Sequence, residues 1–352
     1  MCRKTAFIPR SLAPRVYRNH RAGQNSCVRS APYGAGVPSA TGRGTLPSVP
    51  GPAIVCTILP TALCERLHPV TQSLPTSSAP HGAHIDLDAR EAFLHRLIAK
   101  AAARALEGFA KRQAGQFTLK GPQDFLTETD LAVEDLIRAE IAVAFPDDAI
   151  LGEEGGGTPA HATWVIDPID GTANFARGVP HFCVIIAFCV EGECLLGAIA
   201  HPVLNETYLA RSGRGAFKND APIHVSATTD MGQACIEMGW SRRHPVARYL
   251  EAQSFVLETG ANLRRGGSGG LALAYVAEGR SDGYLELTMN SWDCLAGLLL
   301  VKEAGGRTGS WPATLTDLTG LGPVLAAPAA LADVLVGVGF DGLALREMPP
   351  TD

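Results

Sequence analysis

The stretch from Trp164 to Phe175 constrains the fold of this chain most, and its sequence is WVIDPIDGTANF. Its first three residues are apolar, which is typical of a short buried strand. Two aspartates follow, three positions apart around a proline, and buried carboxylates are costly unless a positive charge lies between them. A divalent metal ion would supply that charge. The Gly-Thr that follows could begin a helix whose N–H groups suit a phosphate, so the stretch predicts a metal-dependent phosphatase.

The composition fits a protein with a sizeable core. The chain has 352 residues, of which 46% are hydrophobic and 18% charged, enough for one large domain or two ordinary ones. Its apolar runs are shorter than the about 20 residues that cross a bilayer, so we expect no membrane partner and a cytoplasmic location. Nine cysteines without a C-x-x-C pair predict reduced, buried thiols rather than a zinc site or disulfides.

The charge is distributed unevenly along the chain. Residues 1–84 carry nine Lys or Arg and one acid, whereas the rest carries 21 basic and 34 acidic residues. An acidic body makes nucleic acid an unlikely partner. Residues 1–84 are rich in Pro, Gly, Ser and Arg without a sustained period. They are predicted to be a disordered or non-native basic extension, with an organelle transit peptide as the alternative, and residues 85–352 to be the folded domain.

Helices and short strands alternate in the predicted domain. We expect a helix capped by Asp88 that runs to about Arg112, and a second over about 130–145, capped by Thr129 with Leu131 facing inward. Strand patterns over 181–190 and 194–200 flank a tight turn and predict a hairpin. Further helices are expected over 246–258, 271–278 and 294–304. Because hairpins dominate the middle, the pattern favours a layered mixed α/β fold over a doubly wound one.

The candidate catalytic acids lie in four places, each at a junction between predicted elements: Asp130, Glu153–Glu154, Asp167 with Asp170, and Asp293. Acids at element ends can converge on one crevice. Taken alone, the glutamate pair is explained as a solvated loop, and Asp293 as an acid favoured by a helix dipole. The Asp-Pro-Ile-Asp run is harder to explain that way, because Ile169 between the two acids can offer only its carbonyl.

Four segments in the same order resemble the signature segments of the inositol monophosphatase family: residues 120–130, 152–154, 164–175 and 292–306. The similarity covers roughly residues 85–345. It implies an αβαβα five-layer sandwich, of the type shared with fructose-1,6-bisphosphatase, and usually a homodimer. It also implies hydrolysis of phosphate monoesters with Mg²⁺, which prefers hard oxygen ligands.

The resemblance also implies the roles of individual residues. Two Mg²⁺ ions would be held by Glu153, Asp167, the carbonyl of Ile169, Asp170 and Asp293, with a third, weak metal site near Glu153. Asp130 and Thr172, assisted by Glu153, would orient the attacking water, and Gly171 and Thr172 would cradle the phosphate. Polyol contacts would come from Gly267, Ser268, Gly269 and Glu286. Considered by itself, Gly266 to Gly270 is also explained as a tight turn before a helix.

The first hypothesis is therefore an inositol-1-monophosphatase, in which a metal-activated water attacks a small polyol phosphate directly. The same fold could instead serve a histidinol-phosphatase or a sugar or nucleotide bisphosphate phosphatase. A hypothesis of another class is a regulatory protein that binds RNA or a transcription complex. His181, His201 and His244 receive no role. Arg264 and Arg265 either attract the phosphoester or contact a second subunit, or are ordinary surface charges.

Overall fold

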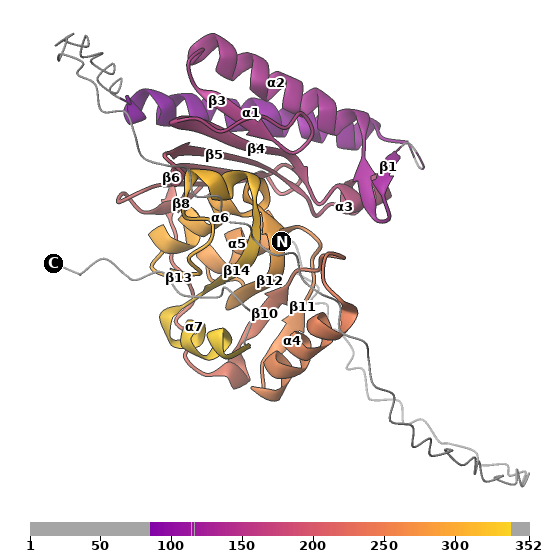
Figure 1. Ribbon diagram of the computed structural model, residues 1–352, viewed down its shortest axis with the longest axis vertical. Coiled ribbons are helices and arrows are strands. Elements are labelled where there is room, and N and C mark those ends of the chain that lie inside the picture. The colour runs from indigo at the N-terminus through magenta and orange to yellow at the C-terminus, as the bar shows by residue number, and fades with distance from the viewer. Residues whose placement is uncertain (1–84, 114, 116, 339–352) are drawn as a thin grey trace, which may run out of the picture. The chain divides into compact units, whose positions relative to one another are not determined.

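The computed structural model describes residues 85–113, 115 and 117–338, all within one compact unit of the chain. The predictions made for residues 1–84 lie outside this part. The described residues form five layers, in the order helices, sheet, helices, sheet, helices (Figure 1). The predicted αβαβα sandwich is thus confirmed. None of the described helices is long and apolar enough to cross a membrane.

The larger sheet has seven strands, in the order β3-β4-β5-β6-β7-β8-β9. β3 runs parallel to β4, and the other neighbours are antiparallel. β4 is buried along nearly its whole length, because helices cover both faces of this sheet, which explains its continuous apolar run. The strands are β3 (Ala149–Gly152), β4 (Ala162–Asp170), β5 (Cys183–Val190), β6 (Glu193–His201), β7 (Glu206–Arg211), β8 (Ala216–Lys218) and β9 (Ala221–Pro222).

Two helices, α1 (Leu87–Lys111) and α2 (Glu128–Ala144), cover the outer face of this sheet. The predicted caps were wrong. Asp86 caps α1 by accepting from the N–H of Ala89 (2.9 Å), and Thr127 caps α2 in a box completed by Asp130. Such a box requires an acid three residues after the cap, which Thr129 does not have. Leu131, predicted to face inward, is 47% exposed, because the buried face of α2 is the one that carries Val133, Ile137 and Ile141.

The middle layer consists of α5 (Gly269–Ala277) and α6 (Ser291–Glu303), which pack between the two sheets and are buried on nearly all sides. Their core also takes residues from β5, β6, β12 and β14. Gly197 of β6 allows α6 to come close, because a Cβ at this position would lie 2.9 Å from the Cα of Ala296. Both predicted helices are confirmed, with α6 starting three residues earlier than expected.

The smaller sheet has five strands, in the order β11-β10-β12-β14-β13, and α4 (Val246–Glu258) and α7 (Ala329–Leu335) cover its outer face. Its strands are β10 (Cys235–Met238), β11 (Asn262–Arg264), β12 (Gly283–Asn290), β13 (Arg307–Thr308) and β14 (Leu321–Ala327). The remaining described elements are the hairpin β1 (Thr118–Gly121) and β2 (Asp124–Leu126), helix α3 (Thr172–Arg177) and the 3₁₀ turns Met231–Gln233, Leu315–Thr319 and Val336–Val338.

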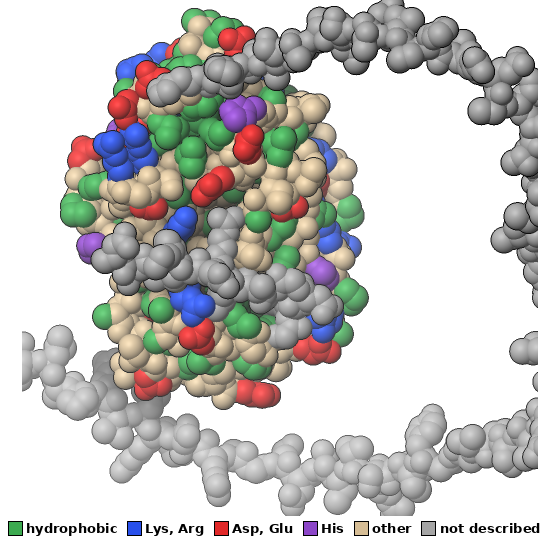
Figure 2. Space-filling model, turned by 60° about the vertical axis from the view of Figure 1, so that its left-hand side comes forward, with side chains coloured by type: hydrophobic (Ala, Val, Ile, Leu, Met, Phe, Trp, Pro, Cys, Tyr) green, Lys and Arg blue, Asp and Glu red, His purple; other side chains and the backbone are tan. Residues whose placement is uncertain are grey.

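The described part of the chain contains five of the nine cysteines. The five described cysteines are free thiols, and Cys183, Cys189 and Cys294 are buried. On the face drawn in Figure 2, basic and acidic side chains are interspersed among hydrophobic ones.

A buried ion pair joins α1 to the start of the larger sheet. The guanidinium of Arg90 donates to both carboxylate oxygens of Asp148 (2.7 and 2.9 Å), and the indole N–H of Trp164 donates to the same carboxylate (2.9 Å). The side chains of Arg90 and Asp148 are only 10% and 4% exposed. Removing one partner of such a pair leaves an uncompensated buried charge.

We expect Asp148→Ala to lower the free energy of unfolding by about 3–5 kcal/mol, because Arg90 and Trp164 lose their acceptor together. Urea denaturation followed by circular dichroism measures this. The neighbouring Asp147 is exposed, so Asp147→Ala is the matched control and should change stability by less than about 0.5 kcal/mol. Equal losses of stability in Asp148→Ala and Asp147→Ala would contradict the claim that the pair of Arg90 and Asp148 stabilises the fold.

Candidate active site

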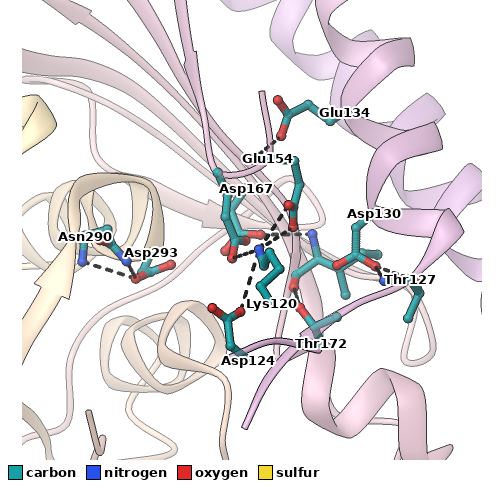
Figure 3. A network of polar contacts seen from close by, with 12 residues as sticks. Lys120, Asp124, Thr127, Asp130, Glu134, Glu154, Asp167, Thr172, Asn290 and Asp293 are labelled. Carbon is teal, nitrogen blue, oxygen red and sulfur yellow. Dashed lines mark hydrogen bonds and ion pairs between the residues drawn. The ribbon is translucent and has the colours of Figure 1, made fainter. Parts of the chain in front are cut away.

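The four acidic segments meet where β3 and β4 end and α2, α3 and α6 begin (Figure 3). The parallel register of β3 and β4 pairs Gly152 with Ile166, so the next residues along, Glu153 and Asp167, lie side by side. The N–H of Glu153 still donates to the carbonyl of Ile166 (3.2 Å). Asp167 itself is only 1% exposed. The sheet thus brings together two acids that are 14 positions apart in sequence.

A bulge at the end of β4 turns Asp167 and Asp170 toward the same crevice. Residues three apart on a regular strand point to opposite faces. Here Asp167 pairs with Ile185 and Asp170 with Cys183, so β4 holds one extra residue opposite β5, as in a β-bulge. The N–H of Ile169 donates to Asp167 Oδ1 (2.9 Å), and its carbonyl accepts from the hydroxyl of Thr172 (2.9 Å).

Asp170 is held at the start of α5. Its carboxylate accepts from the hydroxyl of Ser268 (2.6 Å) and from the N–H groups of Gly270 (2.7 Å) and Gly269 (3.3 Å). A helix N-terminus favours a negative charge in this place. Ser268 and Gly269, predicted to contact the polyol, therefore bind Asp170 in the structure. Gly267 next to them is exposed.

Asp130 and Asp293 occupy equivalent positions, each the third residue of its helix. Asp130 Oδ2 accepts from the N–H (3.1 Å) and the hydroxyl of Thr127. Asp293 Oδ2 accepts from the backbone and side-chain nitrogens of Asn290 (3.2 and 3.0 Å). In each of these two capping boxes, only one oxygen of the carboxylate accepts the hydrogen bonds. The other oxygen of Asp130, Oδ1, is buried and has no hydrogen-bond partner among the described residues.

Gly171 connects β4 to α3, and the backbone at this position requires glycine. Its φ is +91°, in the left-handed region, and a Cβ there would lie 3.1 Å from the carbonyl oxygen of His181. α3 begins at Thr172 without a side-chain cap. The first N–H groups of a helix have no partner within the helix, so backbone donors lie directly beside the carboxylates.

Burial, together with the charges of neighbouring carboxylates, raises the pKa values of these acids. Burial, followed by the charge of Asp293, raises the pKa of Glu153 to about 8, although Lys120 opposes this. Burial raises the pKa values of Asp130 and Asp293 to about 6. Burial and the charges of Glu153 and Asp170 raise the pKa of Asp167. The crevice therefore favours an added positive charge.

The ammonium group of Lys120 lies 3.5 Å from Glu153, 3.0 Å from Glu154 and 3.7 Å from Asp124 (Figure 3). It neutralises part of this cluster.

The donor chemistry of this group fits Mg²⁺. Carboxylates and the carbonyl of Ile169 are the hard oxygen ligands that Mg²⁺ prefers, and the raised pKa values show how poorly these acids tolerate each other unaided. Among the described residues, no three His, Cys, Asp or Glu side chains are already arranged as a finished metal cluster. The carboxylates accept the hydrogen bonds given above.

Glu134, which the sequence-based predictions did not include, supports the loop that carries Glu153. Its side chain is 3% exposed and accepts from the N–H groups of Glu154 (2.9 Å) and Gly155 (2.7 Å). Arg138 also donates to it (2.7 Å). The available signal was its spacing: Asp130 and Glu134 are four residues apart and so share one helix face, which is the buried one.

A large open cavity of about 1120 Å³ lies in front of the acids and is lined by Glu153, Glu286 and Asp293. A smaller pocket of about 190 Å³ is lined by Asp170, Ser268 and Glu286. Burial raises the pKa of Glu286 to about 8, although it accepts from the hydroxyl of Tyr284 (2.5 Å). The predicted polyol contact Glu286 thus borders the same space as the predicted metal ligands.

The raised pKa of Glu153 predicts a pH dependence of stability. An acid with a folded-state pKa above its unfolded value binds more protons when folded, so its contribution to stability is lost as pH rises through the folded pKa. In metal-free protein, the free energy of unfolding should fall as pH rises from about 7.5, where the histidines of the unfolded chain are mostly deprotonated, through the folded-state pKa of Glu153 at about 8. Mg²⁺ should reduce this fall.

Urea denaturation at several pH values, with chelator and with Mg²⁺, measures this effect. Glu153→Gln should flatten the slope, whereas the exposed Glu128 provides a control, Glu128→Gln, that should not. Stability of the metal-free protein that rises over this window would contradict the electrostatic account.

Comparison with known proteins agrees with this geometry. The model of the inositol monophosphatase family matches residues 86–336. The inositol-1-monophosphatase of Rhizobium meliloti (strain 1021) is 38% identical over 268 residues, covering 74% of this chain and 97% of that protein. The Nus factor SuhB of Pasteurella multocida (strain Pm70) is 36% identical over 245 residues, covering 68% and 92%.

Among solved structures, the extragenic suppressor protein SuhB from Bartonella henselae matches with a TM-score of 0.66 and 30% identity, covering 71% of this chain and 98% of that one. The family match takes in every residue of the acidic crevice, from Asp130 to Asp293. The chain therefore belongs to the inositol monophosphatase family of phosphatases.

Proposed function

We propose that this chain is a Mg²⁺-dependent phosphate monoester hydrolase, with myo-inositol 1-phosphate as the first substrate to test. The observation that carries this proposal is the meeting of five acids beside the helix start at Gly171 and Thr172, namely Asp130, Glu153, Asp167, Asp170 and Asp293. A phosphate ester is itself anionic, and an acidic crevice would repel it without bound cations. With cations bound to the acids, the N–H groups at Gly171 and Thr172 would be able to bind the phosphate of such an ester.

Glu153, Asp167, the Ile169 carbonyl, Asp170 and Asp293 would hold two Mg²⁺ ions, with a third near Glu153. Bound there, such ions would neutralise phosphate charge and lower the pKa of a water molecule. The chain's own residues would do the rest. The N–H groups of Gly171 and Thr172 would bind phosphate oxygens. The unpartnered Oδ1 of Asp130 would accept a hydrogen bond from the attacking water, with Thr172 and Glu153 helping to orient it.

Asp130 suits this task at neutral pH. Its pKa of about 6 leaves the carboxylate mostly ionised at pH 7, yet close enough to the working pH for proton transfer. The polyol would lie in the pocket bordered by Gly267, Ser268, Gly269 and Glu286, where Glu286 could accept from a hydroxyl. Direct attack by water, without a covalent phosphoenzyme, would complete the reaction.

The alcohol half of the substrate is chosen by this pocket, and the alternatives differ there. Histidinol phosphate would bring cationic groups to Glu286, and a sugar or nucleotide bisphosphate would bring a second phosphate. Phosphate release from histidinol phosphate, fructose 1,6-bisphosphate and an adenosine bisphosphate, compared with myo-inositol 1-phosphate, separates these alternatives by kcat/KM.

A regulatory role is the second candidate, because several relatives carry the name Nus factor SuhB. By this hypothesis residues 1–84, with nine basic residues and one acid, would engage RNA or a transcription complex. Deleting 1–84 should then abolish that binding while leaving hydrolysis intact. The homodimer, the cytoplasmic location and the division into an extension (1–84) and a phosphatase domain (85–352) stay predictions.

Asp167→Asn should lower kcat/KM for myo-inositol 1-phosphate by about a hundredfold or more, because it removes one of the charges that would hold the metal. Phosphate release in the presence of Mg²⁺ measures this. Asp147→Asn, the same change at an exposed aspartate, should leave the rate unaltered. The proposal fails if the wild-type chain releases no phosphate from any substrate of the panel, or if Asp167→Asn retains full activity.

A further inference from the structure

Asn174 lies within the acidic motif but is neither a metal ligand nor a phosphate donor in the proposed site. It is the third residue of α3, is part-buried, and lines the large cavity. Its side-chain nitrogen, Nδ2, donates to the carbonyl oxygens of His181 (2.8 Å), Gly266 (3.0 Å) and Gly267 (3.4 Å). His181 precedes β5 of the larger sheet, whereas the two glycines follow β11 of the smaller sheet. One amide group thus joins segments that come from different sheets.

The position of Asn174 Nδ2 requires a hydrogen-bond donor. Three carbonyl oxygens converge on it, and carbonyl oxygens only accept hydrogen bonds. The two N–H groups of a side-chain amide can satisfy them, whereas a carboxylate of the same size would bring a further acceptor and a negative charge. The same chemistry fixes the orientation of the amide, with Nδ2 rather than Oδ1 toward the carbonyls.

Residues 266–270, the alcohol loop, are held from two sides. Asn174 donates to carbonyl oxygens at the beginning of the loop, and Asp170 accepts from hydroxyl and N–H groups at its end. Asp170 and Asn174 are four positions apart in sequence, with Gly171 and Thr172 between them. The acceptor and the donor that hold the alcohol loop therefore flank the two residues that would bind the phosphate.

The alcohol loop packs directly against Gly171. A Cβ at Gly171 would lie 3.2 Å from the carbonyl oxygen of Gly267 and 3.3 Å from the Cβ of Ser268. Gly267 and Ser268 also line the smaller pocket beside Glu286. The position of the alcohol loop therefore sets how far the predicted alcohol contacts lie from the predicted phosphate donors.

We propose that Asn174 is a positioning residue that holds the alcohol loop in place against the phosphate donors, and so sets the rate for substrates whose alcohol contacts that loop. This inference rests on the proposed function, because Gly171 and the alcohol loop must bind the two halves of one ester. Asn174 acts through the backbone of Gly266 and Gly267 rather than by contact with the substrate. A misplacement of about 1 Å by a distant substitution can cost about a hundredfold in rate.

The kinetic test compares two phosphate esters with the full chain and Mg²⁺. One is myo-inositol 1-phosphate, or the panel substrate that the chain hydrolyses best, whose polar groups can contact the alcohol loop. The other is p-nitrophenyl phosphate, whose leaving group carries no hydroxyl besides the ester oxygen. Asn174→Ala should lower kcat/KM about tenfold or more for the first ester and less than about threefold for the second. The Mg²⁺ concentration for half-maximal rate should stay unchanged, because Asp170 keeps its own bonds to the loop.

Asn219→Ala is the matched control. Asn219 Nδ2 also donates to a backbone carbonyl, that of Asn205 (3.0 Å), but Asn219 lies outside the lining of both cavities. This substitution should leave the ratio of the two kcat/KM values unchanged. Asn174→Ser leaves room for a water molecule that can donate to the same carbonyls. It should give a smaller shift in the same direction, and it answers the question if the alanine variant does not fold.

Hydrogen exchange of the metal-free protein, followed by mass spectrometry, checks the physical basis without a substrate. Amides of the alcohol loop should exchange faster in Asn174→Ala than in the wild type, and those of β6 and β7 should not. Equal losses of kcat/KM for the two esters, no loss for either, or unchanged exchange in the loop would overturn the inference and leave the proposed function standing. A wild-type chain that hydrolyses neither p-nitrophenyl phosphate nor any panel substrate would reject the proposed function itself.

Discussion

Mutual repulsion among carboxylates buried in one crevice is the constraint on which this structure depends. The fold offsets it with backbone donors at helix starts: Asp130 accepts from Thr127, Asp293 from Asn290, and Asp170 from Gly270. Positive helix ends favour such charges, and Lys120 adds one ammonium group. Burial and the remaining repulsion still raise the pKa of Glu153 to about 8. A bound divalent cation would stabilise the ionised group.

The five layers are what bring these acids together. Asp167 and Asp170 lie on the larger sheet, Asp130 on an outer helix, and Asp293 on a helix packed between the sheets. Close packing is required for this, as Gly197 against Ala296 illustrates. The site therefore depends on the whole core, and the supporting residue Glu134 acts through the backbone of the loop that follows Glu153.

The layered mixed α/β fold was predictable from the alternating helix and strand patterns, whereas the five-layer order and the shared acidic site were expected from the resemblance of the motifs to the inositol monophosphatase family. The strand register and the bulge that turn Asp167 and Asp170 to one side depend on β3 and β5, and sequence does not show them. Cap positions failed at Asp88 and Thr129 because several capping residues stand next to each other there. The binding of Asp170 by Ser268 could not be foreseen, since the two are 98 residues apart.

The central claim is that the acidic crevice would hold the metal. Anomalous diffraction from crystals soaked in Mn²⁺, which accepts the same oxygen ligands as Mg²⁺, tests this most directly. The account predicts peaks among Glu153, Asp167, Asp170 and Asp293. No peak at these carboxylates in crystals of an enzyme that hydrolyses phosphate esters with Mn²⁺ would contradict it.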